Sequence, residues 1–257
     1  VKPNLSIKQA DELIRLSEKN SAGKITDKQL ITLGQLIEKR DAKPRLSDST
    51  ISYLKELHVQ EVFNKTSEIR SKYLDKGIQV EEKSISLYSE IMNQPFYKNT
   101  ERKKNAFITG EPDNAKGIIR DIKSSWSIDT FPMYDTEIKN KMYYWQLQGY
   151  MELFNLNQAE LIYCLIDTPD MLIEDEQRRT SWKLGFIDLP DNLAAEIQKN
   201  MTFSDIPQAL RCKVFAVDRD QKAMQQLEKQ ILLCREYLNQ LSVNLGDQIL
   251  TQKTLSI

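Results

Sequence analysis

The chain has 257 residues, enough for one large domain or for a core domain with helical additions. Its 36 basic and 37 acidic residues give a net charge of −1, so any positive charge that attracts nucleic acid must be local, in a groove or channel. The three cysteines form no CxxC pair, which favours a reducing compartment such as the cytoplasm. No apolar stretch is long enough to span a bilayer, so we expect no membrane partner.

The first part of the chain, residues 1–60, has the pattern of helices separated by polar breaks. Thr26 and one of the polar residues 47–49 each precede a stretch with apolar residues at helical spacing, as N-cap residues do. A long helix is predicted over residues 64–92.

From residue 105 the pattern changes to short strands. The runs NAFITGEPD and GIIRDIKSS are joined by a polar turn and predict a hairpin. The run NQAELIYCLIDTP is apolar on both faces, which indicates a buried central strand. The remaining patterns predict helices over 137–154, 174–186 and 218–241 and a strand over 211–218. This order predicts an α/β fold with a mixed central sheet flanked by helices.

The stretch GEPDNAKGIIRDIK, residues 110–123, contains a possible metal site. Side chains alternate along a strand, so Asp121 and Lys123 are expected on one face, and Asp113 in the other arm of the hairpin can reach the same end of that face. Two close carboxylates repel each other unless a cation lies between them, and oxygen ligands without histidine favour Mg²⁺ or Mn²⁺. Lys123 could orient or deprotonate a water, with a pKa that falls near the cation. The competing interpretation is a polar surface hairpin with an ion pair.

Pro-Asp followed by a short spacer and Asp-x-Lys on a strand resembles the PD-(D/E)XK nuclease superfamily. Two flanking patterns strengthen this resemblance. Gly77 and Glu81 in KGIQVEEKS are similar to the G-x-x-x-E helix of phage-type exonucleases in the lambda exonuclease and YqaJ group. Gln146 and Tyr150 in QLQGY resemble the Q-x-x-x-Y helix of the RecB-like branch. Each pair is four residues apart and therefore shares a helix face, and glycine at the first position would allow a close approach to the sheet or to DNA.

The resemblance implies a restriction-endonuclease-like nuclease domain over 61–257, with residues 1–60 as an N-terminal helical extension. It implies one or two Mg²⁺ or Mn²⁺ ions, held by the side chains of Glu81, Asp113 and Asp121 and the backbone carbonyl of Ile122. Lys123 would position the attacking water, and Gln146 would brace the site or contact the DNA backbone.

Further residues are candidates for DNA contacts, each with a structural alternative. They are Tyr143 and Tyr150, which could be ordinary helix packing, Ser124, which could be a solvated strand end, and Arg102, Lys103 and Lys104, which could be a solvated turn. At the metal site, Glu82 competes with its neighbour Glu81.

The function that the resemblance implies is a metal-dependent DNA exonuclease of the phage recombination type. Such an enzyme acts on duplex ends and passes single strands to an annealing protein, and some relatives are homo-oligomers. The alternatives are an endonuclease of the same fold, of restriction or repair type, and a DNA-binding module that has lost catalysis.

Overall fold

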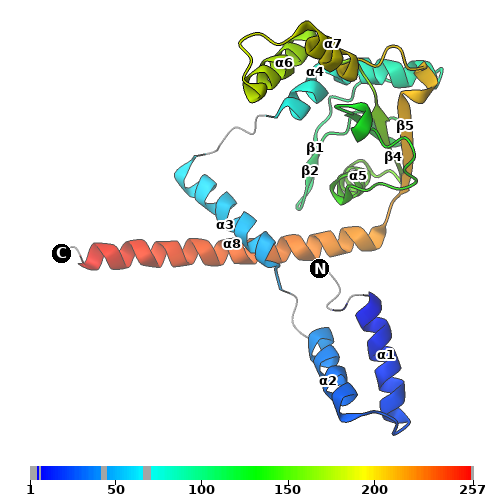
Figure 1. Cartoon of the computed structure of the whole chain (residues 1–257). Coiled ribbons are helices and arrows are strands. Elements are labelled where there is room, and N and C mark those ends of the chain that lie inside the picture. The colour runs from blue at the N-terminus through cyan, green and yellow to red at the C-terminus, as the bar shows by residue number, and fades with distance from the viewer. Residues whose placement is uncertain (1–4, 6, 42–44, 66–70, 256–257) are drawn as a thin grey trace. The chain divides into compact units, whose positions relative to one another are not determined.

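The computed structural model describes residues 5, 7–41, 45–65 and 71–255. The chain divides into two compact units, one made of residues 1–66 and 225–257 and the other of residues 67–224 (Figure 1). Helix α8 (Gln221–Leu255) therefore runs from the second unit into the first. The predicted extension over 1–60 and nuclease domain over 61–257 stay a prediction about which parts of the chain fold independently.

The first unit begins with three helices, α1 (Ile7–Ser21), α2 (Asp27–Asp41) and α3 (Asp48–Phe63). Helices α1 and α2 pack through buried leucines that cluster with Leu5, which precedes α1. These leucines are Leu13, Leu16, Leu33 and Leu36. The predicted caps are confirmed. Thr26 and Gln29 exchange side-chain-to-backbone hydrogen bonds, and Ser47 accepts a hydrogen bond from the N–H of Thr50. Helices in this part of the chain were correctly expected.

The predicted helix over 64–92 is shorter than expected. Helix α3 ends at Asn64, a C-cap in the left-handed region with φ of 49°. Asparagine tolerates this conformation better than most residues. Helix α4 then spans Lys72–Ile91, and residues 66–70 lie outside the described part of the chain.

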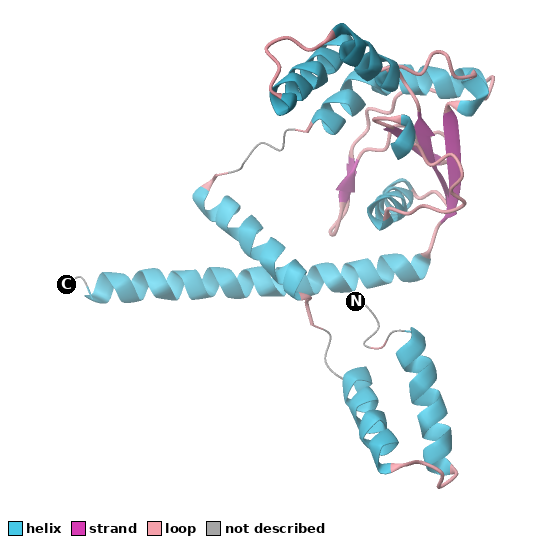
Figure 2. Ribbon diagram, in the orientation of Figure 1, coloured by secondary structure: helices cyan, strands magenta, loops and turns pink. Residues whose placement is uncertain are grey.

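The second unit contains a three-stranded sheet in the order β3-β4-β5 (Figure 2). Strand β3 (Ile119–Ser124) is parallel to β4 (Gln158–Cys164), and β5 (Cys212–Asp218) is antiparallel to β4. The prediction of a buried central strand is confirmed, because β4 lies between the other two. Strands β3 and β4 can run parallel because the chain between them is long and contains a helix, which carries it back to the start of the sheet.

Each face of this sheet packs against one helix. On one face, α4 contributes Val80, Leu87 and Tyr88, which cluster with residues that include Ile162 of β4. On the other face, α5 (Lys141–Phe154) contributes Leu147 and Met151, which cluster with residues that include Ile119, Leu161 and Phe215. Neighbouring residues of β4 thus face opposite helices, as the period of a strand requires. The predicted α/β fold, with a mixed sheet flanked by helices, is confirmed.

Further helices follow the central strand. Helix α6 (Asp170–Leu184) was predicted over 174–186, α7 (Asp191–Met201) was not predicted, and α8 continues well beyond the predicted end at residue 241. None of the described helices is long and apolar enough to cross a membrane.

The predicted hairpin over NAFITGEPD and GIIRDIKSS is wrong. Strand β2 (Thr109–Gly110) pairs with β1 (Lys103–Lys104), whereas β3 pairs with β4. Among the described residues, the backbone pairing next to the turn is a single antiparallel bridge between Asn114 and Arg120. Strand β3 pairs along one edge with the long, apolar β4, and a pairing of its other edge with the two-residue β2 would bury far less surface.

Candidate active site

Asp113 lies along the free edge of β3. The backbone N–H of Arg120 points outward from this edge strand and donates to the carbonyl of Asn114 at 2.8 Å. Two residues further on, the N–H of Ile122 also points outward, and it donates to the side-chain Oδ2 of Asp113 at 2.5 Å. The carboxylate of Asp113 therefore takes the place of a neighbouring strand's carbonyl. This contact fixes Asp113 beside the residues that flank Ile122.

Asp121 and Lys123 lie on the same face of β3, as the strand period predicts. Their Oδ2 and Nζ atoms are 2.6 Å apart, and Asp121 is only 2% exposed. Apart from this ion pair, Oδ2 of Asp121 has no partner among the described residues. A carboxylate that is buried with spare lone pairs is the kind of group that a cation or a water can use.

The two carboxyl groups are harder to ionise than usual. Burial, and after it the charge of Asp121, raises the pKa of Asp113 to about 6, although the N–H of Ile122 and Lys123 oppose the rise. Burial also raises the pKa of Asp121, against the opposing effect of Lys123, and the charge of Glu81 adds to the rise. Burial is the largest cause of both shifts, and neighbouring negative charge adds to it.

Lys123 has a pKa above its usual value. Burial alone would lower this pKa, but the charge of Asp121, its hydrogen bond and the charge of Asp113 outweigh burial. Without a metal the lysine is therefore an ammonium at neutral pH, and the fall in pKa that we expected beside a cation is absent from this state. The ammonium also lies 5.0 Å from the centre of the Tyr143 ring, within the range of a cation–π contact.

Glu81 reaches the same cluster from helix α4. It contributes to the raised pKa values of both Asp113 and Asp121. Its Oε2 is held 2.7 Å from Nζ of Lys98, a residue that the sequence analysis did not consider. Glu82, the competing candidate, is exposed. The geometry therefore favours Glu81 over Glu82.

Gly77, one turn before Glu81, does not pack against the sheet. A Cβ atom added there would meet no atom within 4 Å. The expectation that this glycine allows a close approach of helix and sheet is therefore wrong. An approach of DNA to this position stays a prediction.

Gln146 and Tyr150 contact each other on α5, with Nε2 of Gln146 donating to the Tyr150 hydroxyl at 2.9 Å. Burial, and after it the charge of Asp121, raises the pKa of Tyr150, which places this ring beside the carboxylates. The ring also lies against Gly110, where an added Cβ would come within 2.5 Å of Cε1 of Tyr150. Glycine is required at position 110 by this close approach.

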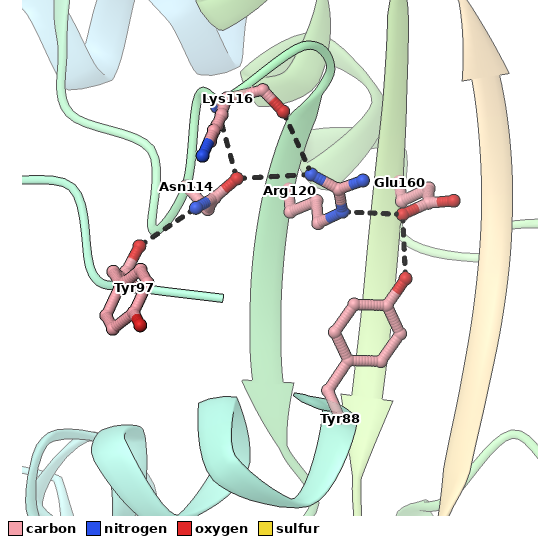
Figure 3. A network of polar contacts seen from close by, with 6 residues as sticks. All are labelled: Tyr88, Tyr97, Asn114, Lys116, Arg120 and Glu160. Carbon is pink, nitrogen blue, oxygen red and sulfur yellow. Dashed lines mark hydrogen bonds and ion pairs between the residues drawn. The ribbon is translucent and has the colours of Figure 1, made fainter. Parts of the chain in front are cut away.

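A polar network on the opposite face of β3 supports the turn that carries Asp113 (Figure 3). Arg120 donates through Nε to Glu160 of β4 at 3.0 Å and through Nη1 to Oδ1 of Asn114 at 3.1 Å. Glu160 also accepts from the hydroxyl of Tyr88, on α4, at 2.9 Å. The side-chain amide of Asn114 donates to the carbonyl of Tyr97 at 2.8 Å. The network links the turn after Asp113 to the central strand and to α4.

A buried lysine adds a second support that the sequence analysis missed. Lys76 of α4 has no exposed surface, and its Nζ donates to the carbonyls of Ser125 and Trp126 at 2.7 and 3.2 Å. It therefore ties α4 to the end of β3. Burial lowers its pKa to about 8, with Asp167 opposing. A lone lysine in a polar helical stretch gives no sequence signal for this role.

Not all predicted DNA-contacting residues lie with the carboxylates. Ser124 is on the face of β3 that packs against α4, and its hydroxyl is 2.8 Å from that of Ser84. Arg102 pairs with Glu111 at 3.2 Å, and Lys103 lies 4.4 Å from the centre of the Phe154 ring. Lys104 is exposed. The structure shows no cluster that joins these groups to Asp121 and Lys123.

The donor set fits a divalent cation in part. Asp113 and Asp121 supply hard carboxylate oxygens, and Oδ2 of Asp121 has unused acceptor capacity. However, in the described part of the chain no three acidic, histidine or cysteine side chains already lie close enough together to hold a metal. Glu81 is paired with Lys98 instead. Asp113 and Asp121 therefore fit a divalent cation, and Glu81 could join them only after leaving Lys98.

The fold is similar to that of solved phage-type exonucleases, which is consistent with the resemblance to PD-(D/E)XK nucleases. Solved structures similar to this chain include a phage-related exonuclease from Haemophilus somnus 129PT, which is 28% identical, with a TM-score of 0.65 over 78% of this chain and 86% of that chain. The alkaline exonuclease LHK-Exo from Laribacter hongkongensis is 13% identical, with a TM-score of 0.53 over 81% of this chain and 89% of its own. A structure of LHK-Exo in complex with dAMP is also 13% identical. Its TM-score is 0.54, over 80% of this chain and 88% of that chain.

These similarities confirm the resemblance to phage-type exonucleases and the predicted fold. A scan against models of protein families and a search of curated proteins find no match to the chain. The comparisons support a nuclease of the exonuclease type, and they leave the role of each site residue as a prediction.

Proposed function

We propose that this protein is a Mg²⁺- or Mn²⁺-dependent deoxyribonuclease that degrades duplex DNA from its ends, in phage-type recombination or repair. The similarity to a phage-related exonuclease over most of both chains supports the exonuclease activity. The metal dependence rests on the side chains of the site.

The observation that carries the proposal is the burial of Asp121 beside Asp113, with Lys123 at 2.6 Å. An ion pair on a surface hairpin would contribute about 0–1 kcal/mol and would need no second carboxylate. Here two carboxyl groups are withdrawn from water near one ammonium, and their burial raises both pKa values although the ammonium opposes the rise. Such an arrangement disfavours the metal-free protein and favours a bound divalent cation.

Each residue of the site has a distinct proposed role. Asp113, Asp121 and Glu81 hold the cation, together with the carbonyl of Ile122. The bound cation would supply a Lewis acid for the scissile phosphate and for the negative charge that develops on it. Lys123, as an ammonium, donates hydrogen bonds that orient the attacking water and a phosphate oxygen. Gln146 holds the hydroxyl of Tyr150, so that both side chains keep a fixed position beside the cluster.

DNA is the proposed substrate, and its backbone would approach the edge of the sheet where Asp113 lies. A single-strand annealing protein and further copies of the chain are proposed partners, on the ground of the resemblance alone. Host cytoplasm, where the cysteines would stay reduced, is the proposed location.

A time course on end-labelled linear duplex tests the proposal. With Mg²⁺ or Mn²⁺ we expect progressive release of nucleotides, and with EDTA none. Closed circular DNA of the same sequence separates the two nuclease types, because an exonuclease leaves it intact and an endonuclease nicks it. Cleavage that persists in EDTA would contradict metal dependence. Asp121→Asn is the matched control for a contaminating nuclease, because it replaces a single carboxylate oxygen with an NH2 group and should be inactive.

A further inference from the structure

Two of the three cysteines face each other across strands β4 and β5. Cys164 and Cys212 are register partners in the antiparallel pair, and their Sγ atoms are 3.4 Å apart. Both are free thiols. Nothing in the proposed nuclease chemistry uses either residue, because their side chains pack with the α4 face of the sheet.

The backbone geometry of this pair suits a disulfide. The N–H of Leu165 donates to the carbonyl of Arg211 at 2.8 Å, so the next pair along, Cys164 and Cys212, is at a non-hydrogen-bonded position. At such positions the Cα atoms are about 4.5 Å apart and the side chains approach most closely. Disulfides span Cα separations of about 4.4–6.8 Å. Since an S–S bond is about 2.05 Å long, the two sulfurs need to approach by about 1.4 Å from their 3.4 Å separation.

The two thiols differ in their exposure and in their pKa. Cys164 has no exposed surface, whereas Cys212 is partly exposed on the edge strand β5. The hydrogen bond from Cys164 lowers the pKa of Cys212, and so does the charge of Arg211, although burial opposes them. Because the thiolate is the reactive form, the accessible cysteine is also the more nucleophilic one.

We propose that Cys164 and Cys212 are a redox-reactive pair, which a hydroperoxide converts into an intrachain disulfide. The thiolate of Cys212 attacks a peroxide oxygen, which breaks the O–O bond and leaves a sulfenic acid on Cys212 and hydroxide or alkoxide, which takes up a proton. Cys164 then attacks the sulfur of Cys212 and displaces hydroxide, which leaves as water with the Cys164 proton. The two thiols lose two electrons, and the peroxide gains them.

The bond would close a loop that contains α6 and α7 and would fix the end of β4 to β5. Residue Cys164 is also the register partner of Ser124, the residue after Lys123 on β3. The proposal does not depend on nuclease activity, since it follows from the thiol pair alone.

The test uses the full chain, freshly reduced and then treated with hydrogen peroxide in native buffer. Thiols are counted with Ellman's reagent after unfolding, and peptides are mapped by mass spectrometry without reduction. We expect the count to fall from three to one, with Cys164 and Cys212 in one cross-linked peptide pair that dithiothreitol releases. The Cys234→Ser variant should lose both of its remaining thiols at the same rate.

Cys212→Ser is the decisive variant, because its serine fits the partly exposed edge position. It should show no intrachain cross-link, and Cys164, being buried, should keep its thiol. The proposal is overturned if the wild-type chain keeps all three thiols under conditions that oxidise a small thiol in solution. It is equally overturned if Cys212 stops at sulfinic acid, or if the cross-link joins two chains through Cys234.

Discussion

The side chain of Asp113 accepts a hydrogen bond from the backbone N–H of Ile122 at 2.5 Å. This one contact joins a turn to the free edge of β3 and sets Asp113 beside Asp121, which precedes Ile122 in the chain. The burial that results raises the pKa of Asp113 to about 6. In the metal-free site the ionised form of Asp113 is therefore disfavoured, even with the Lys123 ammonium nearby.

The raised pKa of Asp113 predicts how the stability of the metal-free protein depends on pH. The folded-state pKa of Asp113, about 6, lies above the ordinary value of 3.8, so folding favours the protonated form. Stability should be highest below about pH 4, fall as Asp113 ionises through pH 6, and stay lower above it. Asp113→Asn should remove this fall and stabilise the protein by at most about 3 kcal/mol at pH 8. Urea unfolding in EDTA at several pH values measures it.

The exposed Asp188 offers a matched control. Asp188→Asn should leave the pH profile unchanged. An Asp113→Asn protein that is less stable than wild type at pH 8, or that does not fold, would mean that the carboxylate has a structural role instead.

Divalent cations should stabilise the protein through the same residues. With Ca²⁺ or Mn²⁺ at about 100 times its dissociation constant, the expected gain in unfolding free energy is about 2.7 kcal/mol, because the cation binds only the folded state. Asp121→Asn should abolish this gain. Thermal unfolding with and without EDTA is the measurement, and an equal gain in the variant would place the cation elsewhere.

The Arg120 network should control metal affinity without touching the metal. Arg120 bonds to both Asn114, next to Asp113, and Glu160 of the central strand. Arg120→Met should therefore loosen Asp113 and weaken Mn²⁺ binding by roughly 10–100-fold, as changes to supporting residues commonly do. Isothermal titration measures it, with the exposed Arg178→Met as control. Unchanged affinity in a folded Arg120→Met protein would show that Asp113 is held by Ile122 alone.

The two glycines of the motifs should respond in opposite directions to alanine. At Gly110 an added Cβ would lie 2.5 Å from the Tyr150 ring, so Gly110→Ala should destabilise the protein by about 1–3 kcal/mol. At Gly77 the space is open, so Gly77→Ala should stabilise helix α4 by up to about 1 kcal/mol. Chemical denaturation of both variants checks this. A Gly77→Ala variant that is stable but cleaves DNA poorly would support contact between α4 and DNA.

The strand period was enough to predict some of the site from sequence. It placed Asp121 and Lys123 on one face, and the structure agrees. The same period puts Ser124 with Ile122 on the α4 face, away from the face that carries Asp121 and Lys123, and its contact with DNA stays a prediction.

Other features depend on tertiary contacts that a local pattern does not contain. Asp113 was expected to reach the site through a hairpin, but it does so as a side chain on a strand edge, because β3 pairs with the distant β4. The pairing of Glu81 with Lys98 and the burial of Lys76 likewise join segments that are far apart in sequence or carry no motif.

The most direct test of the central claim is single-turnover cleavage by Lys123→Ala at saturating Mg²⁺ and DNA. If Lys123 orients the attacking water, its removal should slow cleavage by roughly 10²–10⁴-fold while metal binding survives, because the lysine is not a ligand. Lys183→Ala, on the exposed end of α6, should cleave at the wild-type rate. A loss of less than about tenfold, equivalent to about 1.4 kcal/mol of barrier, would contradict the account and leave Lys123 as no more than an ion-pair partner of Asp121.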